Sequence, residues 1–428
     1  MNKLVLIPVL ALILLLIDWY AFQAVKTATQ NLSSNARTIW HNVYWGLAVL
    51  MIFGLFVYHF VDPYLLGRKI RTMLMVVIFT HYFAKFFVII FLIIDEIWRI
   101  MQWIGQKLGI GDSNTVVETP GVIAESVEEP SITRSQFLAK AGLIAAVVPI
   151  VGVSYGIISG AHDYRVRRRR IVLPNLPKEF DGMRLAQISD VHSGSFWNRT
   201  AVQGGIEMLL KEKPDMIFFT GDLVNNVADE MKDYVSIFGK LKAPYGVFST
   251  LGNHDYGDYV GWSSPEAKAK NLQNLIETHR AMGWDILMDE HRVIKEGQAE
   301  IGVLGIQNWS AKGRFPKYGS LAAAHRGTEN LPVKLLLSHD PSHWMAEVIP
   351  QYQDVDVTFS GHTHGMQFGI DIKGFRWSPV KYVYPEWADL YQSGEQYLYV
   401  NRGFGYLGFP GRVGIPPEIT IVELAKNA

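Results

Sequence analysis

Hydrophobic residues gather in four long runs within the first 160 positions of the 428-residue chain. A helix needs about 20 mostly apolar residues to cross a bilayer, and the runs predict four transmembrane helices. We therefore expect a multi-pass integral membrane protein in contact with the lipid bilayer. The first run lacks a small-residue cleavage site and further spans follow it, which favours an uncleaved anchor over a signal peptide. The runs are Leu4–Phe22, Val43–Val61, Met73–Ile94 and Phe137–Ile158.

Two polar residues, His81 and Lys85, lie one helical turn apart inside the third run. Polar side chains at this depth can form an ion or lipid-headgroup site. They can also face the interior of the helix bundle or snorkel outward, and this second interpretation is favoured.

The segment between the third and fourth runs, residues 111–135, is acidic and contains Pro120 and Pro130. This composition predicts a flexible exposed loop. We therefore divide the first part of the chain into transmembrane helices at 1–110, a loop at 111–135 and a fourth transmembrane helix at 136–160.

The pattern changes at Asp163, where short β-rich runs begin to alternate with helix-like stretches. Buried strands that interleave with helices predict an α/β domain over residues 163–428. The expected helices are Thr200–Lys213 and Pro265–Met282. The expected strands are Leu185–Ile188, Met216–Thr220, Val247–Leu251, Val303–Ile306, Val333–Leu337 and Val355–Phe359.

Composition and charge limit the partners and the metal ligands that we expect for this chain. The chain has 40 Lys and Arg and 40 Asp and Glu, so no global charge favours nucleic acid, and none is expected as a partner. Cys is absent, so a metal site must use His, Asp, Glu or Asn.

A basic run, Arg165 and Arg167–Arg170, follows the fourth apolar run. It could bind anionic lipid, mark the cytoplasmic end of the span, or form the polar face of a strand. The side of the membrane that the α/β domain faces depends on this choice and stays open.

Five of the expected strands end in residue types that bind metals. In an extended segment, residues i and i+2 point the same way, so Asp190 and His192 can reach one ion together. His362 and His364 can do the same where both face the cavity. In α/β folds, ligands gather at the carboxyl ends of strands, so five such ends indicate a metal centre. They carry Asp190-Val-His192, Gly221-Asp222, Gly252-Asn253-His254-Asp255, His339-Asp340 and Gly361-His362-Thr363-His364.

The order of these motifs resembles the calcineurin-like metallophosphoesterases over about Ile171 to Leu424. The resemblance implies an α/β fold, a four-layer αββα sandwich with two mixed sheets, and a metal-dependent phosphoric ester hydrolase. It also implies a dinuclear centre and a catalytic pair in which His254 stands beside the phosphate and Asp255 orients it. In that centre Asp190, His192 and His364 would hold one ion, Asn253, His339 and His362 the other, and Asp222 would bridge them.

Such a centre implies a mechanism. Two divalent ions about 4 Å apart would lower the pKa of a bridging water and clamp the phosphoryl oxygens for in-line attack by hydroxide. His254, on the opposite side, would protonate the leaving oxygen or stabilise the transition state. Oxygen and nitrogen ligands suit Mn, Fe, Zn or Co. The alternative is a membrane transporter or sensor whose soluble domain binds a phosphorylated ligand without turnover. Retention of His254 favours the enzyme, because a binding module needs no acid.

The resemblance also bears on the substrate. Membrane-linked members of the family cleave phosphomonoesters, phosphodiesters or the pyrophosphate of nucleotide-linked lipids, which implies a phosphorylated small molecule or a lipid-linked substrate. Arg402 and Arg412 are candidate phosphate-binding side chains, and the aromatic-rich stretch around them is a candidate acyl or glycolipid groove. Met366 stands where many membrane-linked relatives carry Gly, so we expect different substrate contacts here.

Overall fold

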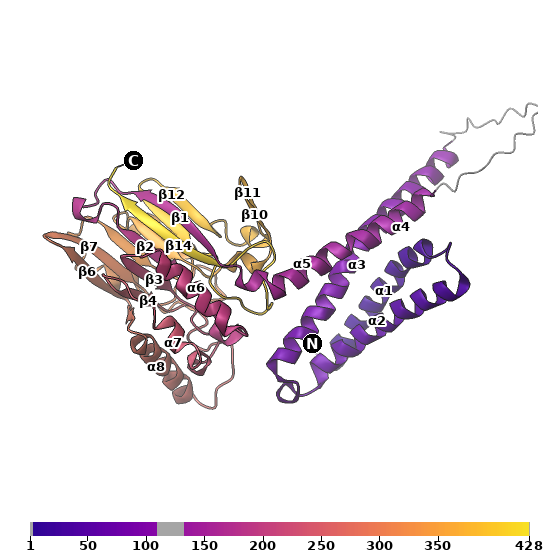
Figure 1. Cartoon of the computed structure of the whole chain (residues 1–428), viewed down its shortest axis with the longest axis horizontal. Coiled ribbons are helices and arrows are strands. Elements are labelled where there is room, and N and C mark those ends of the chain that lie inside the picture. Colours follow the sequence, from indigo (N-terminus) through magenta and orange to yellow (C-terminus); the bar gives the residue numbers. More distant parts are fainter. Residues whose placement is uncertain (1–2, 109–131, 428) are drawn as a thin grey trace, which may run out of the picture. The chain divides into compact units, whose positions relative to one another are not determined.

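The computed structural model describes residues 3–108 and 132–427. The chain forms two compact units, Met1–Ser154 and Tyr155–Ala428 (Figure 1). Most of the loop expected at residues 111–135 lies outside the described residues, and helix α4 begins at Arg134.

The first unit holds three of the apolar spans and most of the fourth, among the described residues. Four stretches are long and apolar enough to cross a bilayer, namely Leu4–Ala28, Ser34–Phe60, Ile70–Lys107 and Arg134–His162. The four predicted transmembrane helices are therefore confirmed, and the fourth consists of two successive helices. The helices are α1 (Lys3–Ala28), α2 (Ser34–Phe60), α3 (Pro63–Lys107), α4 (Arg134–Ala145) and α5 (Val147–Ile158).

Small residues and a polar cluster around Asp18 contribute to the contacts between these helices. A Cβ on Gly142 of α4 would lie 3.1 Å from the Cβ of Phe91 of α3, a close approach that small residues permit in membranes. Lys85 of α3 is buried and forms an ion pair with the buried Asp18 of α1. The hydroxyl of Tyr82 donates to Asp18 Oδ2 at 3.1 Å. Lys85 thus faces the bundle interior, as the favoured interpretation expected.

The second unit contains two six-stranded mixed sheets and a separate hairpin. The first sheet has the order β1-β14-β2-β3-β4-β5, and the second has the order β12-β13-β9-β8-β7-β6. The strands of the first sheet are β1 (Arg165–Val172), β2 (Arg184–Ile188), β3 (Met216–Thr220), β4 (Val247–Thr250), β5 (Asp285–Ile286) and β14 (Glu418–Ala425). Those of the second are β6 (Glu290–Glu296), β7 (Ala299–Gly305), β8 (Lys334–Leu337), β9 (Val357–Ser360), β12 (Asp389–Ser393) and β13 (Gln396–Val400). The hairpin pairs β10 (Ile370–Ile372) with β11 (Phe375–Trp377).

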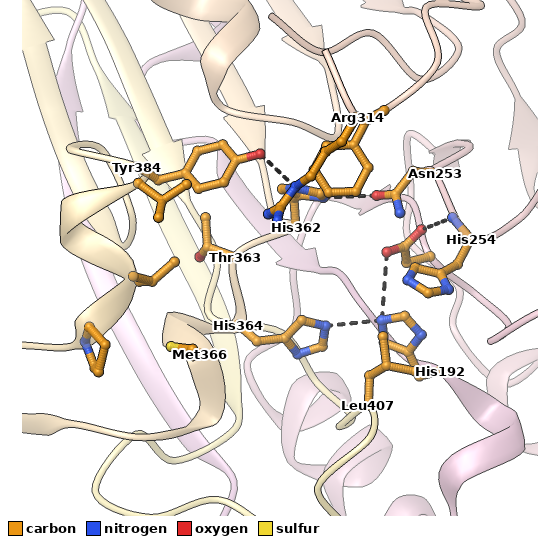
Figure 2. A pocket seen from close by; sticks show the side chains of 15 residues that line it. His192, Asn253, His254, Arg314, His362, Thr363, His364, Met366, Tyr384 and Leu407 are labelled. Carbon is orange, nitrogen blue, oxygen red and sulfur yellow. Dashed lines mark hydrogen bonds and ion pairs between the residues drawn. The ribbon is translucent and has the colours of Figure 1, made fainter. Parts of the chain in front are cut away.

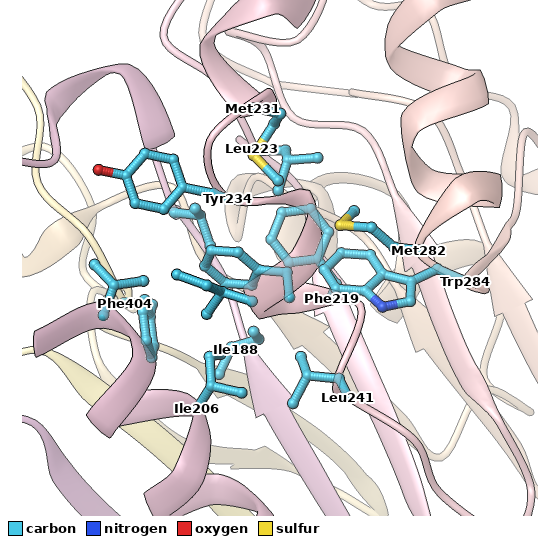
Figure 3. Packing of buried hydrophobic residues seen from close by; sticks show 14 of the residues in the cluster. Ile188, Ile206, Phe219, Leu223, Met231, Tyr234, Leu241, Met282, Trp284 and Phe404 are labelled. Carbon is cyan, nitrogen blue, oxygen red and sulfur yellow. The ribbon is translucent and has the colours of Figure 1, made fainter. Parts of the chain in front are cut away.

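Successive side chains of the buried strands point to opposite faces of each sheet, and this alternation produces the hydrophobic layers of the domain. On β3, Ile217 and Phe219 pack in the core beneath the helices of the first sheet (Figure 3). Met216 and Phe218 pack in the core between the two sheets, because successive side chains of a strand point to opposite faces. A third core lies on the outer face of the second sheet. The predicted four-layer αββα sandwich is therefore confirmed. Its helices are α6 (Arg199–Lys211), α7 (Val235–Phe238), α8 (Pro265–Ala281), α9 (Leu321–His325) and α10 (Ile349–Gln351).

The basic run after the fourth span belongs to a strand. Arg167, Arg168 and Arg169 lie in β1 and form ion pairs with Asp371, Glu212 and Asp389. The structure thus supports the third of the three interpretations, in which the run is the polar face of the first strand.

Candidate metal centre

The predicted ligands lie in the loops that follow β2, β3, β4, β8 and β9. Five of them adopt the left-handed conformation, with φ from 47° to 71°. Such a conformation costs a non-glycine residue on the order of 1–3 kcal/mol and persists only where the surroundings impose it. The chain therefore departs from extended geometry at the point where it presents its polar side chains. The five residues are Asp190, His192, Asp222, His362 and His364.

The first group of ligand atoms comes from the loops after β2 and β9. Asp190, His192 and His364 can jointly hold an ion, since one ligand atom of each lies within 4.8 Å of the others. The Nε2 atoms of His192 and His364 are 2.9 Å apart, and His364 Nε2 is 3.2 Å from Asp190 Oδ1.

The second group comes from the loops after β3, β4, β8 and β9. Asp222, His339 and His362 form it, with His339 Nε2 at 3.1 Å from Asp222 Oδ2. Asn253 completes the group, because its Oδ1 lies 2.8 Å from His362 Nδ1. The spacing argument that paired His362 with His364 on one ion is therefore wrong, and the two histidines serve different groups.

Asp222 connects the two groups. Its Oδ2 lies 3.1 Å from His339 Nε2 in the second group and 3.6 Å from His192 Nε2 in the first. Its other oxygen accepts the backbone N–H of His254 at 2.8 Å. All seven predicted ligands thus converge on one place, with Asp222 between the two sets. Figure 2 shows His192, Asn253, His362 and His364 of this set around the cavity.

The protonation states of three of the four histidines suit cations. Burial lowers the pKa of His192 to about 3 and that of His362 to about 4, and it lowers the pKa of His364 well below its usual value. Burial would also lower the pKa of His339, but the adjacent Asp222 and Asp190 raise it to about 10. Burial would raise the pKa of Asp222, but His339 and His254 lower it well below its usual range. Three neutral imidazoles around an ionised carboxylate match a site for divalent ions.

Hydrogen bonds at the far side of the rings fix which nitrogen faces the centre. His339 Nδ1 donates to the carbonyl of Thr220 at 2.7 Å, which leaves Nε2 free to coordinate. His362 Nε2 donates to the hydroxyl of Tyr384 at 2.9 Å, and that hydroxyl donates to Asp340 Oδ2 at 3.1 Å. Partners of this kind orient metal-binding histidines. Sequence reasoning missed the role of Tyr384, which is one of many aromatic residues in its stretch, although Asp340 was visible beside His339.

His254 lines the cavity at the centre, and its Nδ1 donates to the backbone carbonyl of Asn225 at 2.8 Å. The orienting group is therefore this carbonyl, and the expectation that Asp255 orients the ring needs correction. Asp255 is fully buried and accepts four backbone N–H groups, those of Asp222, Leu223, Val224 and Gly252, at 2.8–3.2 Å. It acts on the loop that carries Asp222, and it does not hydrogen-bond to the imidazole.

Neither Arg402 nor Arg412 lines this cavity, although Arg412 contacts the predicted ligand His364, with Nη2 3.2 Å from His364 Nδ1. Arg402 is fully buried and forms ion pairs with Asp371, Asp389 and Glu418. Arg412 is also buried, and its guanidinium donates to backbone carbonyls, those of Arg402, Gly403, Gly405 and Ile415. Since their donors are already engaged inside the domain, neither side chain is placed to bind a substrate phosphate.

A cavity of about 370 Å³ opens beside the centre. The exposed Arg314 and the ring of Phe315 stand at one wall, and Arg314 has no carboxylate partner among the residues that the structure describes. An apolar wall of the same cavity contains Met366, which has a left-handed backbone (φ 54°) and an exposed side chain. The other apolar residues of this wall are Pro379, Val380, Val383 and Leu407.

Comparisons with known proteins show which families and chains this sequence is similar to. Residues 2–161 match the family described as "Probable Calcineurin-like phosphoesterase, transmembrane domain", and residues 183–366 match "Calcineurin-like phosphoesterase". A Danio rerio transmembrane protein with metallophosphoesterase domain is 28% identical over 293 residues, 66% of this chain and 62% of that protein. The chain thus spans less than two thirds of that relative. The uncharacterized metallophosphoesterase YkuE of Bacillus subtilis is 28% identical over 304 residues, 69% of this chain and 99% of the relative. Phosphodiesterase YaeI of Escherichia coli is 28% identical over 246 residues, 55% of this chain and 80% of the relative.

Proposed function

The chain belongs to the calcineurin-like metallophosphoesterases, and from this premise we propose that its centre binds two divalent metal ions and cleaves a lipid-linked phosphate ester or pyrophosphate. It is a membrane protein and a metal-dependent phosphoric ester hydrolase. The observation that carries the proposal is the position of Asp222, whose Oδ2 faces ligand atoms of both groups at 3.1 and 3.6 Å.

The ligand sets are those of two adjoining sites that share Asp222. Asp190, His192 and His364 would hold one ion, and Asn253, His339 and His362 would hold the other. When bound, such ions supply an activated water at neutral pH and neutralise charge on the phosphoryl oxygens. Nitrogen and oxygen donors without thiolates suit Mn, Fe, Zn or Co.

His254 is the group that handles the proton of the leaving oxygen. Its Nδ1 is engaged with the carbonyl of Asn225 at 2.8 Å, so Nε2 is the nitrogen available to the cavity that the ring lines. A protonated Nε2 can donate to the leaving oxygen as its bond to phosphorus breaks, and the carbonyl stabilises the charged ring.

Arg314 is the side chain best placed to bind the substrate phosphate. It is exposed at the cavity wall and carries a guanidinium that no described carboxylate neutralises. A guanidinium binds phosphate through charge-assisted, often bidentate, hydrogen bonds. It thus takes the role that the sequence suggested for Arg402 and Arg412.

The apolar wall supports a lipid-linked substrate. Met366, Val380, Val383 and Leu407 line the cavity next to the metal ligands, where a small hydrophilic phosphate ester would leave them uncovered. A hydrocarbon or isoprenoid portion would bury this surface, and burial stabilises by about 25 cal/mol per Å².

The test uses the purified full-length chain in detergent, with turnover and bound metal measured on the same samples. Asp222→Asn should lose both metal and hydrolysis, because the shared ligand is weakened. His254→Ala should keep the metal and lose most hydrolysis, since only the proton donor is removed. Asp229→Asn, at an exposed carboxylate of the same domain, is the matched control. Near-normal turnover in both active-site variants would refute these roles.

A further inference from the structure

The last span ends inside the second unit. Tyr155 and Ile158, in the final turns of α5, expose apolar side chains, with 73% of Ile158 accessible. The same turns pack on the segment before β14, because a Cβ on Gly156 would meet Val413 Cγ2 at 2.7 Å. The Gly156 carbonyl also accepts the backbone N–H of Arg412 at 3.0 Å. The segment around Arg412 and Val413 is thus attached to residues at the end of a membrane span.

The β10–β11 hairpin is fixed to this same segment. The backbone N–H of Gly369, just before β10, donates to Val413 O at 3.0 Å, and that of Val413 donates to Gln367 O at 2.8 Å. Tyr155 and Gly160 also line one surface hollow together with Ile370 and Ile372 of β10. The hairpin therefore lies beside the end of the span, within one compact unit (Figure 1).

The two faces of the hairpin differ in polarity. Asp371 is paired across the strands with Arg376, and both side chains point to the domain, where they form ion pairs with Arg402 and Asp389. Directly opposed residues of an antiparallel pair share a face. The other face is therefore wholly apolar. We call it the apolar hairpin face, and it consists of Ile370, Ile372, Phe375 and Trp377.

This face is uncovered in the described structure, with 64% of Ile372 and 53% of Phe375 accessible. Tyr382, an aromatic residue suited to the headgroup region, is exposed nearby in sequence. Lys373 at the tip of the hairpin and Lys381 beside Tyr382 are exposed, and neither has a carboxylate partner among the described residues. Aliphatic and aromatic side chains flanked by free lysines characterise surfaces that enter the interface of anionic bilayers.

We propose that the apolar hairpin face docks on the lipid interface of the membrane that this chain's own helices span, with Lys373 and Lys381 on anionic headgroups. The bilayer is the occupant that the structure favours, because the hairpin is fixed beside the end of a span and its free charges are positive. The docking has a consequence for the catalytic cavity. Met366 and Val383 line that cavity, and they lie in the segments that flank the hairpin, so docking brings the cavity mouth to the lipid surface. The docking itself does not depend on turnover.

Since the chain has no Cys, a single introduced thiol can report depth. Ile372→Cys carries an environment-sensitive dye in the full-length chain, reconstituted into vesicles with about one fifth anionic lipid. The matched control is Gln298→Cys in the exposed β6–β7 turn, at the edge of the second sheet opposite the metal centre. Nitroxide-labelled lipid should quench the dye at 372 at least twofold more strongly than at 298, and aqueous iodide should show the reverse order.

Charge reversal completes the test. Lys373→Glu combined with Lys381→Glu should reduce the lipid quenching at 372 in anionic vesicles and leave it unchanged in neutral ones. Equal iodide quenching at 372 and 298 would overturn the docking. Protection of position 372 from iodide without quenching by lipid would also overturn it, and would indicate a protein partner on this face. Because no readout requires hydrolysis, failure of the docking is distinguishable from failure of the proposed activity.

Discussion

Removal of one hydroxyl should weaken one metal site and spare the other. Tyr384→Phe deletes the group that lies 2.9 Å from His362 Nε2 and 3.1 Å from Asp340 Oδ2. The ring stays, so its packing against His362 at 5.3 Å between centroids is kept. Loss of such a supporting group typically lowers metal affinity 10- to 100-fold. Asp340 Oδ2 remains 3.5 Å from His362 Nε2 and can partly replace the hydroxyl, so we expect about tenfold, or about 1.4 kcal/mol.

The assay is a manganese titration of metal-free protein. Two quantities are measured at each manganese concentration: the rate of hydrolysis of a nitrophenyl phosphate ester and the amount of bound metal. Only one of the two binding phases should shift in Tyr384→Phe, because Tyr384 contacts the second group alone. Tyr382→Phe makes the same chemical change at an exposed tyrosine two positions away and should behave as wild type. Unchanged affinity in Tyr384→Phe, or equal loss in both phases, would refute the reasoning.

Three further predictions concern arginines and acid stability. Arg314→Ala should raise KM for a phosphate ester about tenfold or more with a smaller effect on kcat, as expected for a lost charged hydrogen bond of about 1.5–3 kcal/mol. The control is Arg326→Ala, at an exposed arginine on the same domain. An unchanged KM in Arg314→Ala would contradict the assignment. Arg402→Ala leaves buried carboxylates unpaired and should destabilise the domain by about 3–5 kcal/mol, measured by thermal unfolding; a raised KM with unchanged stability would instead restore a substrate role. Burial would raise the pKa of Asp389, but Arg169 and other arginines lower it below its usual range. Its charged form thus stabilises the fold above about pH 4, and this contribution is lost as the pH falls further. Asp389→Asn should flatten the decline of the melting temperature in that acid range, and an unchanged decline would contradict this.

Periodicity predicted most of the architecture because the buried strands follow simple rules. Met216–Thr220 is apolar at every position but one, and it becomes a central strand that packs on both faces. Some of the strands that periodicity did not predict are polar and lie at edges, whereas β13 and β14 are buried interior strands. The edge strand β6 carries the sequence EHRVIKE, with only Ile294 buried. β12 and β13 were not predicted because they lie in the aromatic-rich stretch near the C-terminus, which was interpreted as a candidate groove. Tyr399 of this stretch belongs to the core.

The sequence predicted which residues form the metal centre, but it did not predict how their side chains are arranged. The rule that places i and i+2 on one side holds for extended backbone, whereas His362 and His364 both have positive φ and reach different groups. The roles of Tyr384 and Arg314 depend on approaches across the fold that no local pattern encodes. Arg402 and Arg412 resembled phosphate ligands by type, but burial among carboxylates and carbonyls gave them structural roles.

Asp255 explains how two separate motifs act as one unit. Its carboxylate accepts the N–H groups of Gly252 in its own loop and of Asp222, Leu223 and Val224 in the loop after β3. Burial raises the pKa of Asp255 to about 7, so we use the value of about 1 kcal/mol for an ordinary hydrogen bond. Four such bonds can offset the strain of the left-handed conformation of Asp222, which is on the order of 1–3 kcal/mol. The position of the shared ligand is therefore set by the protein before any ion binds. The GD and GNHD motifs consequently depend on each other, because the second supplies the carboxylate that holds the aspartate of the first in place.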